Sequence, residues 1–240
     1  MKGVIHAHSK YSFDSLTRID RIIDRAVEEN LDFIILTDHD TINGSLDLRR
    51  RVAEREINLI VPVAAEYKTE HGDIIAAFIS DEIDDMNFEK FITEVKRQGG
   101  ILMLPHPYEA HPVNLIYDIA NSMDLVETYN ARCTPKQDLK SSNLAVKVNK
   151  PEYFGSDSHL EGELCNVIVS VDGESSEEGL KNSLLYNKIE LVTAEKIYLR
   201  NIRFSQFIKA TKQRRIGVLY RNVIALIIDT IRNGWNQRVS

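Results

Sequence analysis

Six of the seven histidines lie at or just beyond the ends of strand-like apolar runs, each beside a carboxylate or another histidine. They are His6, His8, His39, His71, His106 and His159, and only His111 stands apart. Side chains of a strand alternate between its faces, so the spacing of His6 and His8 points both imidazoles the same way. This pattern constrains the fold, because one metal cluster requires all these strand ends to meet.

Carboxylates accompany these histidines: Asp38 and Asp40 flank His39, Glu66 precedes His71, and Asp157 precedes His159. Imidazole and carboxylate together suit zinc, manganese or iron, and the near absence of cysteine argues against thiolate sites. A single histidine on an apolar run is more often a hydrogen-bonded core residue, and Pro105-His106-Pro107 alone suits a rigid loop. Four such groups that end four different strands favour a metal cluster.

At 240 residues and 43% hydrophobic content, the chain suits one α/β barrel or two small domains with a sizeable core. Cys133 and Cys165 are too few for a disulfide scaffold, and the first apolar run already carries His6 and His8 where a secretory leader would be apolar. We therefore expect a cytoplasmic protein. No apolar run approaches the roughly 20 residues that cross a bilayer, so we expect no transmembrane segment.

The charge is distributed unevenly. Residues 200–240 contain nine Lys or Arg and one acid, Asp229, although the net charge of the chain is −6. Such a tail either meets an anionic partner or folds back on the acidic remainder. Residues 216–235 also predict a helix with a broad apolar face, which can pack on the protein, pair in a homo-oligomer or lie on an anionic membrane surface. We favour packing within one chain or across a dimer.

Strand-like runs alternate with helical patterns along most of the chain. Helical periodicity marks residues 18–29, 88–98, 113–123 and 136–148, a hairpin is expected between residues 59 and 79, and only helices are expected after Val171. Continuous apolar strands between helices are typical of a parallel sheet buried on both faces. Since the candidate ligands come from strands spread over residues 6–159, we favour a closed, irregular barrel, which brings all strand ends into one ring.

The order of these motifs resembles the PHP family, whose name joins polymerase and histidinol phosphatase. The motifs are His6-Ala7-His8, Asp14, Thr37-Asp38-His39-Asp40, Glu66, His71, Pro105-His106-Pro107 and Gly155-Ser156-Asp157-Ser158-His159. The resemblance implies a metal-dependent phosphoesterase on a distorted (β/α)7 barrel over residues 1–172, followed by a helical, basic C-terminal extension over residues 173–240. Thr41-Ile42-Asn43-Gly44 and Glu127-x-Tyr129-Asn130-x-Arg132 are most similar to small, stand-alone members that act on nucleotides or short oligonucleotides.

The resemblance also implies two or three divalent metal ions. The first would be held by His6, His8, Glu66 and Asp157; Glu66 would bridge to a second held by His71 and His106; and Asp14, His39 and His159 would hold the third. Closely spaced cations bind phosphate oxygens and activate a water, so no side-chain nucleophile is required.

The remaining candidates are Asp38, Asp40 and Arg132 for catalysis, with Asn130 and Arg132 for substrate binding. Asp40 can orient His39 or cap the helix that begins near Asn43. The forked guanidinium of Arg132 suits a substrate phosphate, and it would equally suit a surface salt bridge.

We therefore expect a hydrolase that cleaves a phosphomonoester or terminal phosphodiester of a small nucleotide-like or oligonucleotide substrate by metal-activated water. The rival hypotheses are a histidinol phosphatase and a non-catalytic metal-binding PHP module. A metal-competent residue at every motif position favours catalysis.

Overall fold

The computed structural model describes residues 1–109, 111–214, 217, 221, 224–225, 228 and 237–240. Its strands are β1 (Lys2–Ala7), β2 (Phe33–Leu36), β3 (Ala64–Thr69), β4 (Gly72–Ala77), β5 (Ile101–Leu104), β6 (Leu125–Asn130), β7 (Glu152–Gly155), β8 (Val167–Val171) and β9 (Ile189–Ala194). Its helices are α1 (Ile19–Glu28), α2 (Asn43–Glu54), α3 (Phe88–Arg97), α4 (Ile116–Ser122), α5 (Pro135–Val148), α6 (Glu177–Tyr186) and α7 (Leu199–Lys212), with a 3-10 turn at Glu161–Glu163. Most of residues 216–235, for which we predicted a helix, lie outside the described residues.

Helices α1, α3, α4 and α5 confirm the four helical segments predicted between residues 18 and 148. Local chemistry explains their ends. The Asn87 side chain accepts a hydrogen bond at the start of α3, and Thr134 and Gln137 form a capping box at the start of α5. Gly99, with φ of +73°, follows α3 in a conformation that glycine adopts readily.

The strands form two sheets, with the orders β2-β1-β8-β9 and β3-β4-β5-β6-β7. β1 and β2 pair in parallel, as do β5, β6 and β7. β3 and β4 form an antiparallel hairpin, which confirms the one predicted between residues 59 and 79. The mixed α/β class is therefore confirmed, whereas the sheets are not purely parallel.

This strand pairing corrects our prediction of a closed seven-stranded barrel. Among the described residues the two sheets are joined by isolated parallel bridges and the few backbone hydrogen bonds beside them. The bridges run from Ala7 to Ser158, from His39 to Glu66, and from Phe33 to Ile60 in the segment that precedes β3. These bridges give β1, β2, β3, β5, β6 and β7 the same direction, so their C-terminal ends gather on one side of the molecule. The strand ends converge as a barrel would require, although no continuous ladder closes the ring.

The backbone is irregular beside the bridge from Ala7 to Ser158. His6 and Asp157 have positive φ angles of 64° and 47°. The register of β1 against β2 shifts between Ile5 and Ala7, on either side of His6. The Ser156 and Asp157 N–H groups still donate to the Ile5 and His6 carbonyls, at 2.9 and 2.6 Å, so β1 and the end of β7 pair over a few residues without forming a regular ladder of extended residues.

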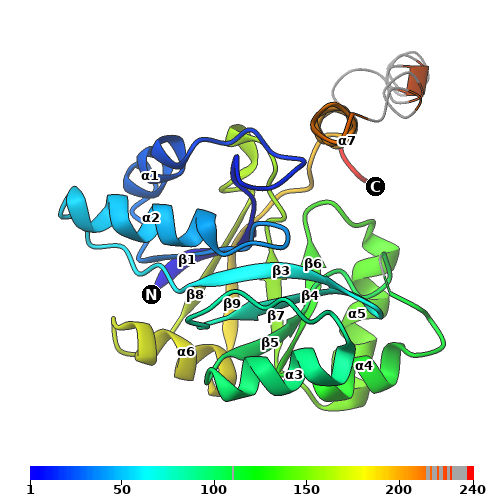
Figure 1. Ribbon diagram of the computed structural model, residues 1–240, viewed down its shortest axis with the longest axis horizontal. Helices are drawn as coiled ribbons and strands as arrows, with labels where there is room; N and C mark the ends of the chain where they lie inside the picture. Colours follow the sequence, from blue (N-terminus) through cyan, green and yellow to red (C-terminus); the bar gives the residue numbers. More distant parts are fainter. Residues whose placement is uncertain (110, 215–216, 218–220, 222–223, 226–227, 229–236) are drawn as a thin grey trace.

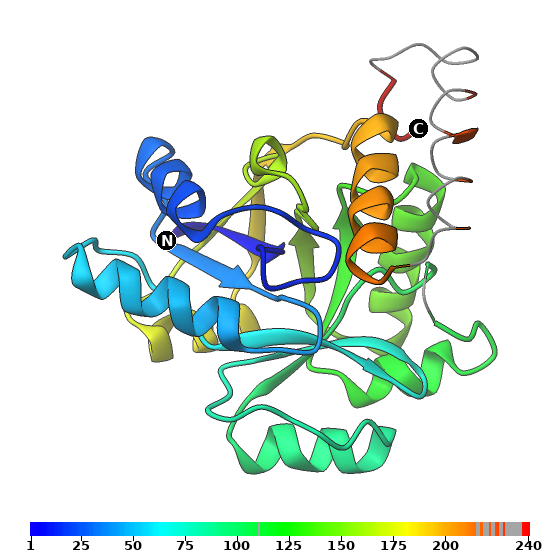
Figure 2. The same ribbon diagram turned by 45° about the horizontal axis from the view of Figure 1, so that its top comes forward.

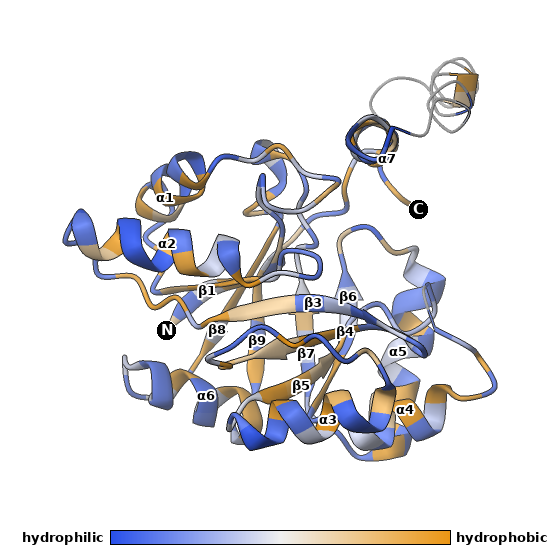
Figure 3. Cartoon of the chain, viewed as in Figure 1, coloured by the Kyte–Doolittle hydropathy of each residue, from blue (hydrophilic) through white to orange (hydrophobic). Residues whose placement is uncertain are grey.

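Hydrophobic residues predominate in the strands (Figure 3), and most of their side chains are buried. Val4 and Ile34 pack toward α1 and α2, whereas Ile5 and Phe33 face the core between the two sheets. Helices α3, α4 and α5 cover the five-stranded sheet, and α1 and α2 lie across the molecule from α3 and α4 (Figure 1). The strands are buried on both sides, as their continuous apolar runs predicted.

The C-terminal segment is not purely helical, which corrects the expectation for residues after Val171. β9 pairs antiparallel with β8 and extends the four-stranded sheet. α7 then stands apart from the other helices, near the C-terminal ends of the strands (Figure 1). Within the described residues, no helix is long and apolar enough to cross a membrane.

Candidate metal centre

The end of β1 brings His6 and His8 to two carboxylates from other strands. His6 Nε2 lies 3.6 Å from both Glu66 Oε2 and Asp157 Oδ1. His8 Nε2 lies 3.5 Å from the same Glu66 oxygen and 3.4 Å from the same Asp157 oxygen. A tetrahedral ion with bonds of about 2.0–2.2 Å would separate its ligands by roughly 3.3–3.6 Å. The four side chains therefore have the spacing of a ligand set.

Glu66 also connects this set to two further histidines. Its Oε1 lies 2.9 Å from His106 Nε2, and its Oε2 lies 3.2 Å from His39 Nδ1. Asp14 continues the group, with one oxygen 3.2 Å from His39 Nε2 and the other 3.4 Å from His159 Nε2. Eight of the nine sequence-predicted ligands thus lie in one connected group.

His71 is the ninth, and the structure places it elsewhere. Its ring packs against Phe88 with the centroids 4.9 Å apart, and its backbone N–H donates to Thr69 in the β3–β4 turn. Since β3 continues past Glu66 for roughly 3.3 Å per residue, a residue five positions later lies far from the Glu66 carboxylate. The assignment of His71 as a metal ligand is therefore corrected.

The ligand group fits a divalent cation because several of its buried polar atoms lack hydrogen-bond partners among the described residues. His6 Nε2, His8 Nε2, Asp14 Oδ1 and Glu66 Oε2 are buried, and none has a hydrogen-bond partner among the described residues. Buried polar atoms without partners cost free energy, unless an ion or water satisfies them. Imidazole nitrogens and carboxylate oxygens are also the donors that zinc, manganese and iron accept.

The carboxylates remain charged although they are buried. Burial raises the pKa of Glu66, but His39 and His6 outweigh it and hold that pKa well below its ordinary value. The pKa values of Asp14 and Asp157 are likewise lowered, because facing histidines overcome the effect of burial. The group therefore concentrates negative charge that positive charge must balance.

The histidines respond in opposite ways. Burial lowers the pKa of His39 and of His106, but the carboxylates outweigh it and raise these values to about 9 and about 10, with Glu66 acting on both. Burial, together with His159 and His39, lowers the pKa of His8 to about 3. Protons on some histidines therefore supply the balancing charge without metal, and a bound cation would displace them.

Glu127 orients His6. Its Oε1 lies 2.9 Å from His6 Nδ1, and its Oε2 accepts hydrogen bonds from the His106 N–H at 2.7 Å and from Asn130 Nδ2 at 2.8 Å. A carboxylate only accepts, so the proton of the neutral His6 ring lies on Nδ1 and the Nε2 lone pair faces the other ligands. We had identified Glu127 only as part of a family motif.

A second relay orients His8. Its Nδ1 lies 3.1 Å from Ser12 Oγ, and that hydroxyl donates to Asp38 Oδ1 at 2.8 Å. Asp38 is 1% exposed and also accepts from the Ser9 N–H and hydroxyl, both at 2.6 Å. Asp38 thus acts on His8 through Ser12, which is a supporting role, and its catalytic role stays a prediction.

Two glycines make room for these supporting carboxylates. A Cβ at Gly155 would lie 1.7 Å from Glu127 Oε1, and a Cβ at Gly44 would lie 1.7 Å from Asp38 Oδ2. Any side chain at either position would displace the carboxylate. Gly44 belongs to the Thr41–Gly44 motif of the sequence, so the structure gives that motif a physical role.

Asp40 lacks the partners that we predicted, whereas Asn130 has partners within the ligand group. Asp40 is exposed, and its carboxylate accepts from the Lys68 N–H. Neither expected role is seen, since α2 begins without a side-chain cap and no contact of Asp40 with the His39 ring is found among the described residues. The Asn130 amide donates to Glu127 and to Asp157, so it supports the ligand group, and its contact with substrate stays a prediction.

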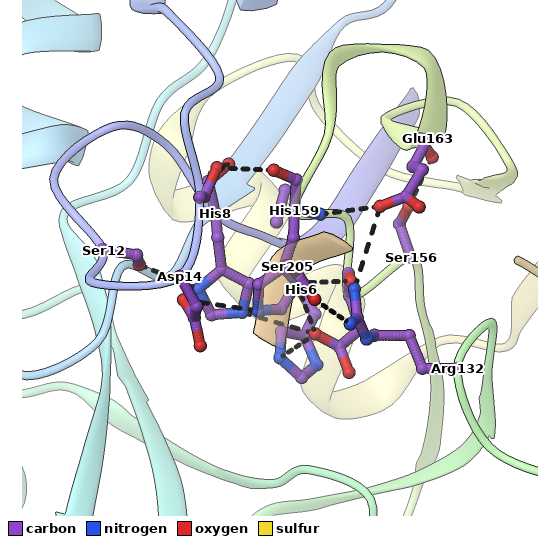
Figure 4. Close-up of polar contacts among 12 residues, drawn as sticks. His6, His8, Ser12, Asp14, Arg132, Ser156, His159, Glu163 and Ser205 are labelled. Atoms are coloured by element: carbon purple, nitrogen blue, oxygen red, sulfur yellow. Dashed lines mark hydrogen bonds and ion pairs between the residues drawn. The ribbon is translucent and has the colours of Figure 1, made fainter. Parts of the chain in front are cut away.

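A cavity of about 270 Å³ opens above the ligand group. Arg132 lines it, with one guanidinium nitrogen donating to Ser205 Oγ at 2.5 Å and another 3.8 Å from Glu163 Oε2 (Figure 4). The sequence analysis missed six other lining residues: Asp73, Glu109, Ile202, Ser205, Gln206 and Lys209. Glu109 lies three residues after His106, but α7 carries no motif that links it to the strand ends.

Comparisons with known proteins identify the family. A model of the PHP domain matches residues 5–132. An uncharacterized protein of Methanocaldococcus jannaschii is 31% identical over 147 residues, which cover 55% of this chain and 82% of that protein.

Two solved structures share the fold. A two-domain protein of Bacteroides vulgatus, described as containing a predicted PHP-like metal-dependent phosphoesterase, matches 81% of this chain with a TM-score of 0.65 and 20% identity. The match spans 65% of that protein, which is less than two thirds of its length. An amidohydrolase of Chromobacterium violaceum matches 68% of this chain and 89% of its own, with a TM-score of 0.56 and 16% identity.

Proposed function

Since this chain belongs to the PHP domain family, we propose that it is a metal-dependent phosphoesterase that hydrolyses a small phosphoester with water as the nucleophile. One observation carries the proposal. Unpartnered ligand atoms of His6, His8 and Glu66 converge beneath a cavity whose wall also contains the cationic side chains of Arg132 and Lys209. Such a site binds divalent cations on one side and a substrate anion on the other.

The ligand atoms suggest how the ions would be held. His6, His8, Glu66 and Asp157 would hold the first ion, Glu66 and His106 would contribute to a second, and Asp14, His39 and His159 would hold a third. Bound divalent ions of zinc, manganese or iron bind phosphate oxygens and lower the pKa of a coordinated water toward neutrality. Two or three ions are therefore expected.

The chain's own residues prepare the site. Glu127 and Ser12 place the protons of His6 and His8 on Nδ1, so each Nε2 lone pair is directed into the ligand group. The His39 backbone N–H also donates to Ser12 Oγ at 2.9 Å, which ties the end of β2 to the same relay. These contacts keep the ligands in position before substrate arrives.

Water is the nucleophile that the described side chains leave available. The Ser205 hydroxyl donates to the Ile202 carbonyl and accepts from Arg132, so no base activates it. Burial raises the pKa of the Cys133 thiol, which therefore stays protonated at neutral pH. A mechanism with a covalent intermediate has no support from either group.

The cavity favours a small substrate. Its volume of about 270 Å³ lies below the roughly 300–1,000 Å³ of sites that enclose drug-sized ligands. We infer that a phosphomonoester, or the terminal phosphate of a nucleotide or short oligonucleotide, enters with its phosphate toward the ligand group.

A substrate screen of the manganese-loaded protein tests this function. We expect phosphate release from nucleotides, short oligonucleotides or histidinol phosphate, abolition by a chelator, and recovery when manganese or zinc is restored. Bound metal without hydrolysis of any member of the panel would instead identify a non-catalytic metal-binding module. Active protein with less than about one metal per chain would contradict the metal-dependent mechanism.

A further inference from the structure

α7 is held across the cavity at both ends. Before its first turn, the Ile197 N–H donates to the Ala131 carbonyl at 2.9 Å, just after the end of β6. At its last turn, Lys212 Nζ donates to the carbonyls of Ser12 at 2.7 Å and Ser15 at 2.8 Å. Figure 2 shows α7 standing beside the loop that follows β1. The helix is therefore attached to both of the segments that carry candidate ligands and their supports.

One face of α7 lines the cavity. Ile202, Ser205, Gln206 and Lys209 all face it, and their spacing of three, four and seven residues places them in one stripe. Three of the four are polar, which is unusual for the inner face of a packed helix. This stripe lies outside residues 5–132, the segment that matches the family model. It thus lies in the part of the chain that the family model does not match.

Lys209 is the cation of that stripe. Its Nζ lies 4.4 Å from the centroid of the Phe13 ring, and the Phe13 ring stacks on His39 with the centroids 4.5 Å apart. Among the described residues no carboxylate pairs with Lys209, so its three N–H donors remain available to a ligand. Arg132, by contrast, already donates to Ser205.

We propose that α7 is the substrate-binding wall of the cavity and that the Lys209 ammonium binds the phosphate group presented to the ligand group. A phosphate bound between the ligand group and α7 needs a cation on each side. Divalent ions would supply positive charge at the ligand group, and Lys209 supplies it at α7. The Phe13 ring holds the lysine stem beside His39, which orients the ammonium without neutralising it. The proposal rests on the proposed function only in its choice of phosphate as the ligand.

Binding of inorganic phosphate to the full-length, stoichiometrically metal-loaded protein tests the proposal by calorimetry. Lys209→Met should weaken phosphate binding roughly tenfold, because a hydrogen bond to a charged group on a half-buried residue is lost. Lys209→Arg should retain most of the affinity, since it keeps the charge. Lys147→Met is the matched control, because Lys147 Nζ also lies over an aromatic ring, 3.8 Å from the Tyr117 centroid, but outside the cavity.

The result that supports the proposal is weaker phosphate binding in Lys209→Met alone, with metal content and melting temperature as in the unmodified protein. Unchanged binding in Lys209→Met overturns it, and so does a loss of metal from that variant, which would make Lys209 part of the metal site. Failure of the unmodified protein to bind phosphate also overturns it. Calorimetry measures binding without turnover. A protein that binds phosphate through Lys209 but hydrolyses no substrate would therefore refute the proposed function and leave this proposal standing.

Discussion

Replacement of Glu127 by Gln tests how the site sets the tautomer of His6. In the structure Glu127 Oε2 accepts two N–H groups, from His106 at 2.7 Å and from Asn130 at 2.8 Å, while Oε1 faces His6 Nδ1 at 2.9 Å. Gln has a single acceptor oxygen, and the two donors hold it at the Oε2 position. Its NH2 group then donates toward His6 Nδ1.

The consequence is a proton on the wrong nitrogen. With Nδ1 accepting, the neutral His6 ring carries its proton on Nε2, the atom that faces Glu66 and Asp157. Loss of such a supporting contact typically costs 10- to 100-fold in metal affinity. His6 is 0% exposed and Glu127 is 1% exposed, so no water can replace the carboxylate. We therefore expect the upper end, about 100-fold, which corresponds to about 2.8 kcal/mol.

Zinc affinity, measured by competition with a chromogenic chelator, is the appropriate assay. Glu163→Gln is the control, because Glu163 is also 1% exposed but accepts from the His159 backbone N–H and not from a ring. We expect that control to stay within about threefold of the unmodified protein, as no ligand tautomer depends on it. Unchanged zinc affinity in Glu127→Gln would refute the tautomer argument.

Four further predictions concern Glu66, Arg132, the titration of two histidines and the C-terminal segment. Glu66→Gln should lose metal and turnover together, by more than about 100-fold, and near-normal turnover would show that Glu66 bridges nothing. Arg132→Lys should lower kcat/KM roughly tenfold with metal content and melting temperature unchanged, whereas unchanged efficiency would exclude substrate contact. In metal-free protein the raised pKa values of His39 and His106 add to the free energy of unfolding, and this contribution is fully present below about pH 6.5. It is lost as pH rises through about 9 and about 10. Urea unfolding from pH 6 to 10 should show the loss, and a flat profile would contradict it. Removal of residues 216–240 should cause aggregation or lower stability with the metal site intact. A stable, monomeric truncated protein, together with full-length protein that sediments with anionic vesicles, would instead make residues 216–240 a membrane anchor.

Much of the ligand group could be predicted from the sequence alone. The spacing of His6 and His8 predicted that their rings meet, and the residues after Leu36, Leu104 and Gly155 were placed at strand ends by apolar runs that stop there. Helices α3 and α5 were equally predictable, since their periodicity and end signals are local. These features depend on interactions between residues that are close in the sequence, so the sequence alone predicts them.

The position of a residue along its strand could not be predicted from the sequence. The spacing of His6 and His8 implied regular alternation, yet β1 shifts register at His6, and His8 lies beyond its end. The Nε2 atoms of both rings still lie 3.4 to 3.6 Å from the same Glu66 and Asp157 oxygens, although His6 has a positive φ of 64°. His71 was misplaced for a related reason, since how far β3 runs before it turns is decided by its pairing with β4.

Only the tertiary structure determined the supports, the sheet arrangement and the upper wall of the cavity. Glu127 and His6 are 121 residues apart, and Arg132 and Ser205 are 73 apart, so no local pattern connects them. Two sheets replace the expected closed ring because only isolated bridges and a few backbone hydrogen bonds, formed between segments far apart in the sequence, join them among the described residues. A buried polar side chain must find a partner, but which partner it finds depends on the path of the whole chain, and that path is set by the sum of many packed contacts.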